Sequence, residues 1–101
     1  MVNTELLRPN EESLSSLADF YRVFADETRI RILCELSGGE RRVLDIANSL
    51  SLSHSAVSHQ LQILRARRLV AYRREGKNVC YSIADEHIFS ILRQGIEHVE
   101  E

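Results

Sequence analysis

The chain has 101 residues, of which 44% are hydrophobic and 28% are charged, and its net charge at pH 7 is −2. These values describe one ordinary globular domain, and the longest stretch without a charged residue, 46–64, contains too many Ser, His, Gln and Asn residues to span a membrane. The acidic N-terminus lacks the apolar stretch of a signal peptide, and two cysteines without a disulfide pattern indicate a reducing, cytoplasmic compartment.

The charged residues are unevenly distributed along the chain. Acidic residues outnumber basic ones near both ends, whereas residues 65–77 carry six cations and one carboxylate. A basic centre between acidic ends indicates one surface for phosphate groups and a second surface with another role. Taken alone, the basic run is equally compatible with a solvated loop.

Apolar residues at helical spacing predict four helices in the first two thirds of the chain. We expect residues 1–11 to form a flexible segment and residues 12–101 to form one domain. Helices are predicted over 12–25, from Asp26 to the glycine pair at 38–39, over 43–50, and after Ser53. Asp26 and Ser53 have side chains that N-cap positions prefer, and a glycine suits the end of the second helix.

The fourth predicted helix has two distinct faces. Its apolar face carries Val57, Leu61 and Leu64. The opposite face carries uncharged hydrogen-bonding groups at helical spacing, namely Ser55, Ser58, His59 and Gln62. A surface helix that serves only solubility more often carries Glu and Lys there, so this face is typical of a recognition surface.

A β-hairpin and a final helix complete the chain. Alternating runs at 69–74 and 78–83 flank Glu75-Gly76-Lys77, which predicts two strands with a basic tip, and Asp85 begins a last helix. The order of elements predicts a mainly α fold with one hairpin, a winged helix-turn-helix that binds double-stranded DNA through the fourth helix and the hairpin. The residues expected at the DNA are His54, Ser55, Ser58, His59, Gln62, Arg65, Arg73, Arg74 and Lys77.

The last helix carries two pairs of metal-ligand residues, Asp85 with His87 and His98 with Glu101. His87 and His98 are eleven residues apart, which places them on one helix face but roughly 16 Å apart, too far for one ion. When two copies of one helix pack antiparallel about a two-fold axis, residue i of one copy lies opposite residue j of the other wherever i + j has the same value. The sums for Asp85 with Glu101 and for His87 with His98 differ by only one, so a two-fold dimer brings two His and two carboxylates together at each end, a set that suits zinc.

Three segments carry a resemblance to a known family: FADETRIRIL at 24–33, LSHSAVSHQL at 52–61 and RREGKNVCYS at 73–82. Together they make the chain similar to the ArsR/SmtB family of bacterial metal-responsive repressors, from about residue 15 onward. The resemblance implies a homodimer through the first and last helices that binds an inverted-repeat operator and releases it when an inducer binds. It implies no enzymatic activity, in agreement with the absence of an evident nucleophile.

The resemblance also implies where the inducer binds. The family's cysteine site at the start of the third helix is missing here, because 40–46 contain no Cys. The family's site between the two last helices matches Asp85, His87, His98 and Glu101, with Glu97, Glu100 or water as alternatives to Glu101. We expect Zn²⁺, with Co²⁺, Ni²⁺ and Cd²⁺ as alternatives.

Two further expectations follow from the resemblance. His98 is expected to transmit the signal by donating its second ring N–H to backbone near Arg68, at the end of the recognition helix. Related redox and persulfide sensors pair a Cys at position 34 with one in the last helix, where this chain has none. We interpret Cys34 as a small buried apolar residue, with redox or persulfide sensing as the alternative function and a winged helix used only for protein contacts as a third.

Overall fold

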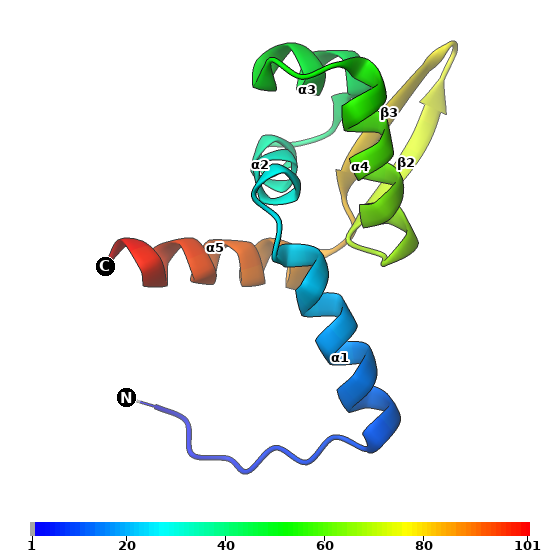
Figure 1. The fold of residues 1–101 in the computed structure, drawn as a ribbon. Helices are drawn as coiled ribbons and strands as arrows, with labels where there is room; N and C mark the ends of the chain where they lie inside the picture. Colours follow the sequence, from blue (N-terminus) through cyan, green and yellow to red (C-terminus); the bar gives the residue numbers. More distant parts are fainter. Residues whose placement is uncertain (1) are drawn as a thin grey trace.

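The structure is a computed structural model that describes residues 2–101. This part of the chain forms five helices and three strands (Figure 1). Their bounds are α1 Glu11–Phe24, α2 Glu27–Leu36, β1 Arg41–Arg42, α3 Val43–Leu50, α4 His54–Ala66, β2 Val70–Glu75, β3 Asn78–Ile83 and α5 Glu86–Glu100. Residues 2–10 lie outside every helix and strand, and the winged helix-turn-helix order is confirmed.

Both predicted N-cap residues form a side-chain hydrogen bond to the helix that they begin. The side chain of Asp26 accepts the N–H of Arg29 at 3.0 Å, and Ser53 Oγ accepts the N–H of Ala56 at 3.1 Å. Each bond satisfies a backbone donor that a helix N-terminus leaves free, so each fixes where α2 and α4 begin. The helix α2 ends at Leu36, just before the glycine pair, as expected.

The sheet has one strand that the sequence did not predict. The strand β1 pairs antiparallel with β3, which also pairs with β2, so the order is β1-β3-β2. Two residues are too few to show an alternating pattern, and β1 is recognised only through its partners. In register, Arg42 of β1 and Arg73 of β2 flank Cys80 of β3.

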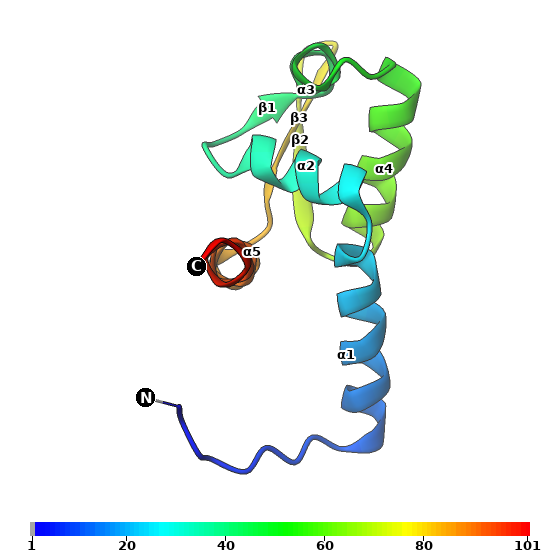
Figure 2. The same cartoon turned by 60° about the vertical axis from the view of Figure 1, so that its left-hand side comes forward.

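The core lies between α2, α3, α4, the sheet and the N-terminal half of α5. Its largest fully buried side chains are Ile32, Leu33, Ile46, Val57, Leu61, Leu64 and Leu69. Figures 1 and 2 show α1 extending away from this core and α5 projecting from it in a different direction. The radius of gyration is 15.1 Å, whereas about 13 Å is expected for a compact domain of this length. The extended segment 2–10 and the two projecting helices both contribute to this larger value.

The outlying helices expose apolar side chains. On α1, Leu14, Leu17 and Tyr21 are exposed. An apolar groove of about 360 Å³ lies between the end of α1, α2 and α5, and its lining includes Tyr21, Phe24, Ile30, Ile91, Ile96 and Val99. Among residues 2–101, no helix combines the length and apolarity needed to cross a membrane.

Candidate DNA interface and metal-ligand positions

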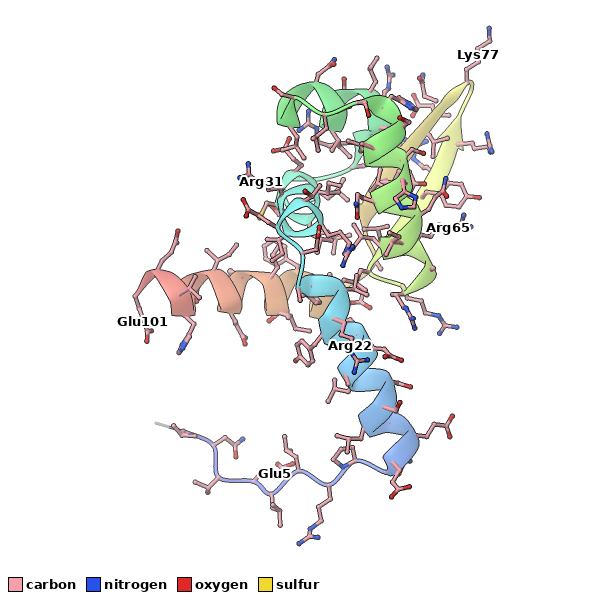
Figure 3. The ribbon with its side chains drawn as sticks, in the orientation of Figure 1. Glu5, Arg22, Arg31, Arg65, Lys77 and Glu101 are labelled. Carbon is pink, nitrogen blue, oxygen red and sulfur yellow. The ribbon has the colours of Figure 1, made fainter. Side chains whose placement is uncertain are left out.

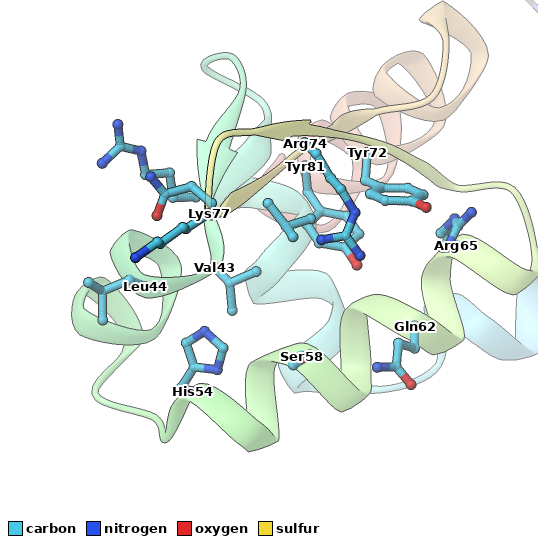
Figure 4. A pocket seen from close by; sticks show the side chains of 13 residues that line it. Val43, Leu44, His54, Ser58, Gln62, Arg65, Tyr72, Arg74, Lys77 and Tyr81 are labelled. Atoms are coloured by element: carbon cyan, nitrogen blue, oxygen red, sulfur yellow. The ribbon is translucent and has the colours of Figure 1, made fainter.

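A groove of about 380 Å³ separates α4 from the hairpin (Figure 4). It is lined by cations, hydrogen-bonding groups and two tyrosines: Arg42, His54, Ser58, Gln62, Arg65, Tyr72, Arg74, Lys77, Asn78 and Tyr81, with Val43, Leu44 and Val79. Lys77 stands at the tip of the hairpin, beyond the end of α4 (Figure 3). The groove is thus a positively charged surface shared by a helix and a wing, as a DNA interface requires.

The structure divides the polar residues of α4 between two directions. His54, Ser58 and Gln62 follow each other at intervals of four and line the groove beneath the hairpin (Figure 4). Ser55 and His59 are exposed and lie outside the groove. The recognition face expected from the sequence is therefore present, but only part of it faces the wing.

On the groove side of the hairpin, two tyrosines and an arginine form a stack. Tyr72 and Tyr81 are partners in the β2–β3 register, and their ring centroids lie 5.8 Å apart. The guanidinium carbon of Arg65 lies 3.7 Å from the centroid of the Tyr72 ring, within cation–π distance. Arg65 thereby connects the end of α4 to the base of the hairpin. The side chain of Arg74 extends from the hairpin into the groove (Figure 4).

Arg73, which was expected at the DNA, is not part of this groove. Side chains alternate along a strand, so Arg73 and Glu75 lie on the opposite face of β2 from Tyr72 and Arg74. Arg73 donates two bonds to Glu40, at 2.8 and 2.7 Å, and one to Glu75 at 2.8 Å. The hydrogen bonds to Glu40 and then to Glu75 raise the pKa of Arg73 above its ordinary value.

The carboxylates around Arg73 also lie near a thiol. Ligand atoms of Glu40, Glu75 and Cys80 fall within 4.8 Å of one another. The Arg73 guanidinium already bonds both carboxylates, and a thiolate would be needed for a soft metal. The cluster is therefore an ion-pair network.

The four predicted metal ligands lie at the two ends of α5. Asp85 is the N-cap, and its Oδ1 lies 3.5 Å from Nδ1 of His87. At the other end, Nδ1 of His98 lies 3.8 Å from Oε1 of Glu101. His87 and His98 are 90% and 81% exposed, so all four side chains are accessible to a ligand and to a second chain. Each pair is assembled locally, and one chain does not bring the two pairs together.

The predicted link between His98 and Arg68 is not made within one chain. The C-terminal end of α5 lies far from the end of α4 in both views (Figures 1 and 2), and Figure 3 shows Glu101 and Arg65 on opposite sides of the molecule. Arg68 has a positive φ of 64° and follows the C-cap of α4. Such a link requires the partner chain.

The expectation that Cys34 is buried was wrong. Cys34 is exposed on α2, beside a small apolar pocket whose lining includes Phe89, Leu92 and Ile96 of α5. Partial burial, and then the charge of Glu35, raise the pKa of its thiol. Its apolar neighbours in that pocket come from α5, and periodicity along one helix does not reveal such a placement.

Sequence reasoning assigned no role at the DNA to seven residues that line the groove: Arg42, Val43, Leu44, Tyr72, Asn78, Val79 and Tyr81. Arg42 is the N-cap of α3 and provides no capping side-chain bond. Its place beside the hairpin depends on the β1–β3 pairing, which has no sequence signal of its own. Tyr72 was identified as a strand residue, but its contact with Arg65 joins segments whose relative placement only the fold provides.

A winged helix-turn-helix with a cationic groove between recognition helix and wing defines a DNA-binding protein. Residues 26–72 match the family described as "Bacterial regulatory protein, arsR family". The chain is 41% identical to the transcriptional repressor SmtB homolog of Synechocystis over all of its length and 81% of that protein. It is 36% identical to the cadmium resistance transcriptional regulatory protein CadC homolog of Staphylococcus aureus, covering 84% of this chain and 71% of that one.

A solved structure shows the same architecture. The homodimeric winged helix-turn-helix DNA-binding domain Mb0332 from Mycobacterium bovis is 28% identical and superposes with a TM-score of 0.84, over 96% of this chain and 92% of that one. The chain belongs to the arsR family of bacterial regulatory proteins. It is a DNA-binding transcriptional regulator and not an enzyme.

Proposed function

We propose that two copies of this chain form a repressor that releases its operator when a divalent metal, zinc first, binds between the two α5 helices. The observation that carries the proposal is the arrangement of α5. It has an Asp–His pair at one end, a His–Glu pair at the other, and apolar side chains between them facing an open groove. A second α5 in antiparallel register would place each pair opposite the other kind of pair.

The case for a dimer rests on surface that one chain leaves uncovered. The apolar groove along α5 includes Tyr21 of α1, which is 50% exposed, and Leu17, one helical turn before Tyr21, is 45% exposed. Contiguous apolar surface of this kind marks association sites. The similar Mycobacterium bovis domain is described as homodimeric, which supports the same assembly here.

The donor chemistry supports a small divalent ion. Two imidazoles and two carboxylates suit tetrahedral zinc, with cobalt and nickel as alternatives, whereas cadmium favours sulfur ligands. Imidazoles must be deprotonated to bind, so affinity should fall as the pH is lowered. When bound, the ion would join side chains of both chains and favour one dimer geometry over others.

Regulation requires that the metal-bound dimer geometry disfavour DNA binding, because tight binding alone shifts no equilibrium. We propose that His98 of one chain donates to backbone near Arg68 of the other. This would connect the metal site to the end of α4 and so to the groove. The coupling must be reciprocal, so operator DNA would weaken metal binding by the same factor.

A thiol sensor at Cys34 is less well supported. A raised pKa lowers the fraction of reactive thiolate, and α5 carries no second cysteine within reach. Cys80 is buried in the wing, on a different element. Among residues 2–101, these are the two cysteines, so no resolving thiol lies beside Cys34.

The test is a titration of the purified protein with zinc, followed by DNA affinity with and without metal. The DNA is a duplex that the protein selects from a random pool. We expect two ions per dimer and weaker DNA binding when the sites are filled. His87→Ala should abolish both effects, and Glu86→Gln, which changes a neighbouring carboxylate, should leave both intact.

The link through His98 needs its own measurement. At full metal occupancy, His98→Gln should retain DNA more tightly than the parent protein does. Equal release by both proteins would exclude the link and leave the metal site standing. Zinc binding without any change in DNA affinity would exclude the regulatory role altogether.

A further inference from the structure

We propose that Arg73 is a positioning residue that fixes the wing against the segment leading into β1, and that it is not a phosphate ligand. This inference rests on the proposed DNA-binding function, because the wing matters only if it contacts DNA. It concerns the face of the hairpin that points away from α4.

The side chain of Arg73 joins two segments that are far apart in the sequence, β2 and the segment before β1. Its Nε and one terminal nitrogen reach the two carboxylate oxygens of Glu40, at 2.8 and 2.7 Å. Glu40 lies 33 positions earlier, immediately before β1. The same terminal nitrogen also reaches Glu75 at 2.8 Å. A two-point guanidinium–carboxylate contact fixes orientation as well as distance.

The outer part of the hairpin has few other attachments: Val70 and Tyr81 anchor its base in the core, but residues 71–78 are all exposed. On the inner side, β1 contributes only two residues to the sheet. On the groove side, the hairpin is held to α4 by Arg65 over Tyr72. Single exposed ion pairs contribute little, but a bidentate pair that belongs to a network is the exception. Arg73 therefore supplies the attachment on the outer face.

The local charge argues against a role as a phosphate ligand. Arg73 is bonded to two carboxylates, so the group of Glu40, Arg73 and Glu75 carries a net charge of −1. An arginine that binds phosphate must be free to present its N–H groups to it, and a surface of net negative charge repels DNA. On the other face, Arg74 and Lys77 line the groove and have no carboxylate partner among the ion pairs of residues 2–101.

Four variants separate the two roles: Arg73→Gln, Glu40→Gln, the charge exchange Glu40→Arg with Arg73→Glu, and Arg74→Gln as the matched control. The first readout is amide hydrogen exchange in the protein without DNA. If Arg73 fixes the hairpin to Glu40, Arg73→Gln and Glu40→Gln both speed amide hydrogen exchange along β2 and β3. The double variant with exchanged charges restores the slower rate of the parent protein. Arg74→Gln, on the opposite face, leaves exchange unchanged.

The second readout is binding to the selected duplex over a range of salt concentrations. The charge exchange should bind within about twofold of the parent protein, as compensating changes in one pair do. Arg74→Gln should lower the salt slope by about one unit, as expected for one lost phosphate contact.

A loss of about one unit of salt slope and of about tenfold or more in affinity in the charge-exchanged protein would identify residue 73 as a phosphate ligand and overturn the proposal. Unchanged amide exchange in both single variants would do the same. If the parent protein binds no DNA, the proposed function fails, and hydrogen exchange still decides whether Arg73 fixes the hairpin.

Discussion

The carboxylate of Asp85 serves its own helix and lies beside His87 at the same time. Its Oδ1 accepts the N–H of Ile88 at 3.1 Å, which starts α5, and the same atom lies 3.5 Å from Nδ1 of His87. The N-cap bond therefore holds one proposed metal ligand next to another before any metal or second chain arrives. This relationship makes the structural and the metal-binding roles of Asp85 separable by mutation.

Asp85→Ser should keep the helix and lose the metal. A serine can cap the helix but provides no carboxylate, so stability should change little and zinc affinity should drop sharply. Asp85→Ala should lose the cap as well, at a cost of about 1 kcal/mol. Thermal unfolding and metal titration of both variants provide the check. Equal zinc affinity in the parent and the Ser variant would remove Asp85 from the ligand set.

Ser58 and His59 on α4 should affect sequence discrimination, and Lys77 at the wing tip should affect overall affinity. Groups that reach base edges distinguish operator from random DNA, whereas phosphate contacts strengthen binding to both. Lys77→Ala should therefore weaken binding to both duplexes and lower the salt slope by about one unit. Ser58→Ala or His59→Ala should lower the ratio between the two affinities. Equal losses on both duplexes for all three variants would contradict this assignment.

Leu17→Glu should give a folded monomer. Leu17 is exposed in the isolated chain, so a charge there costs little until a partner buries it. The dimer dissociation constant should rise by about tenfold or more, equivalent to about 1.4 kcal/mol. Leu44→Glu on α3 is the matched control, because Leu44 is 57% exposed and lies at the DNA groove. Sedimentation equilibrium distinguishes the two.

A dimeric Leu17→Glu protein of unchanged stability would exclude α1 from the interface. Leu92→Glu is less informative, because Leu92 is only 6% exposed within one chain and belongs to the core. A charge there would unfold the monomer whether or not a dimer exists.

Arg68→Gly should stabilise the protein. Arg68 has a φ of 64°, and the N–H of Leu69 bonds to the carbonyl of Leu64 at 2.9 Å, the pattern of a helix end that usually carries glycine. Removing the Cβ relieves strain, and we expect a gain of up to about 1 kcal/mol in the free energy of unfolding. Arg67→Gly, at a residue with negative φ, should destabilise instead. Denaturant unfolding of both variants tests the pair, and a loss of stability in Arg68→Gly would contradict the conformational argument.

Cys34 should react slowly with alkylating agents. Its pKa is raised by partial burial and then by Glu35, so at neutral pH less of it is thiolate than in a free cysteine. Because thiolate is the reactive form, alkylation of Cys34 should accelerate only at a pH above the range in which an ordinary thiol loses its proton. Rates of iodoacetamide labelling measured against pH provide the check. Faster labelling than free cysteine at neutral pH would revive the thiol-sensing alternative.

Local chemistry in the sequence was enough to predict most of the fold. Asp26, Ser53 and Asp85 are the observed N-caps of α2, α4 and α5, because a short oxygen-bearing side chain next to a periodic apolar run fixes a helix start without help from distant residues. Alternation at Val79 and Tyr81 likewise predicted the hairpin. The proposed metal-ligand pairs at the ends of α5 were predicted by spacing alone, because both members of each pair are a few residues apart, and their role stays a prediction.

Only the tertiary structure decided which surface or neighbour each of these side chains faces. Arg73 and Arg74 are adjacent cations that the sequence treats alike, yet strand alternation and the distant Glu40 turn one into an ion-pair network and leave the other at the groove. The same holds for β1, for Arg42, and for Cys34, which proved to be exposed. Contacts between segments far apart in the chain depend on packing directions that no local pattern encodes. For that reason the sequence determined the five helices, the hairpin and the candidate ligands, and the fold determined β1 and which cations line the groove.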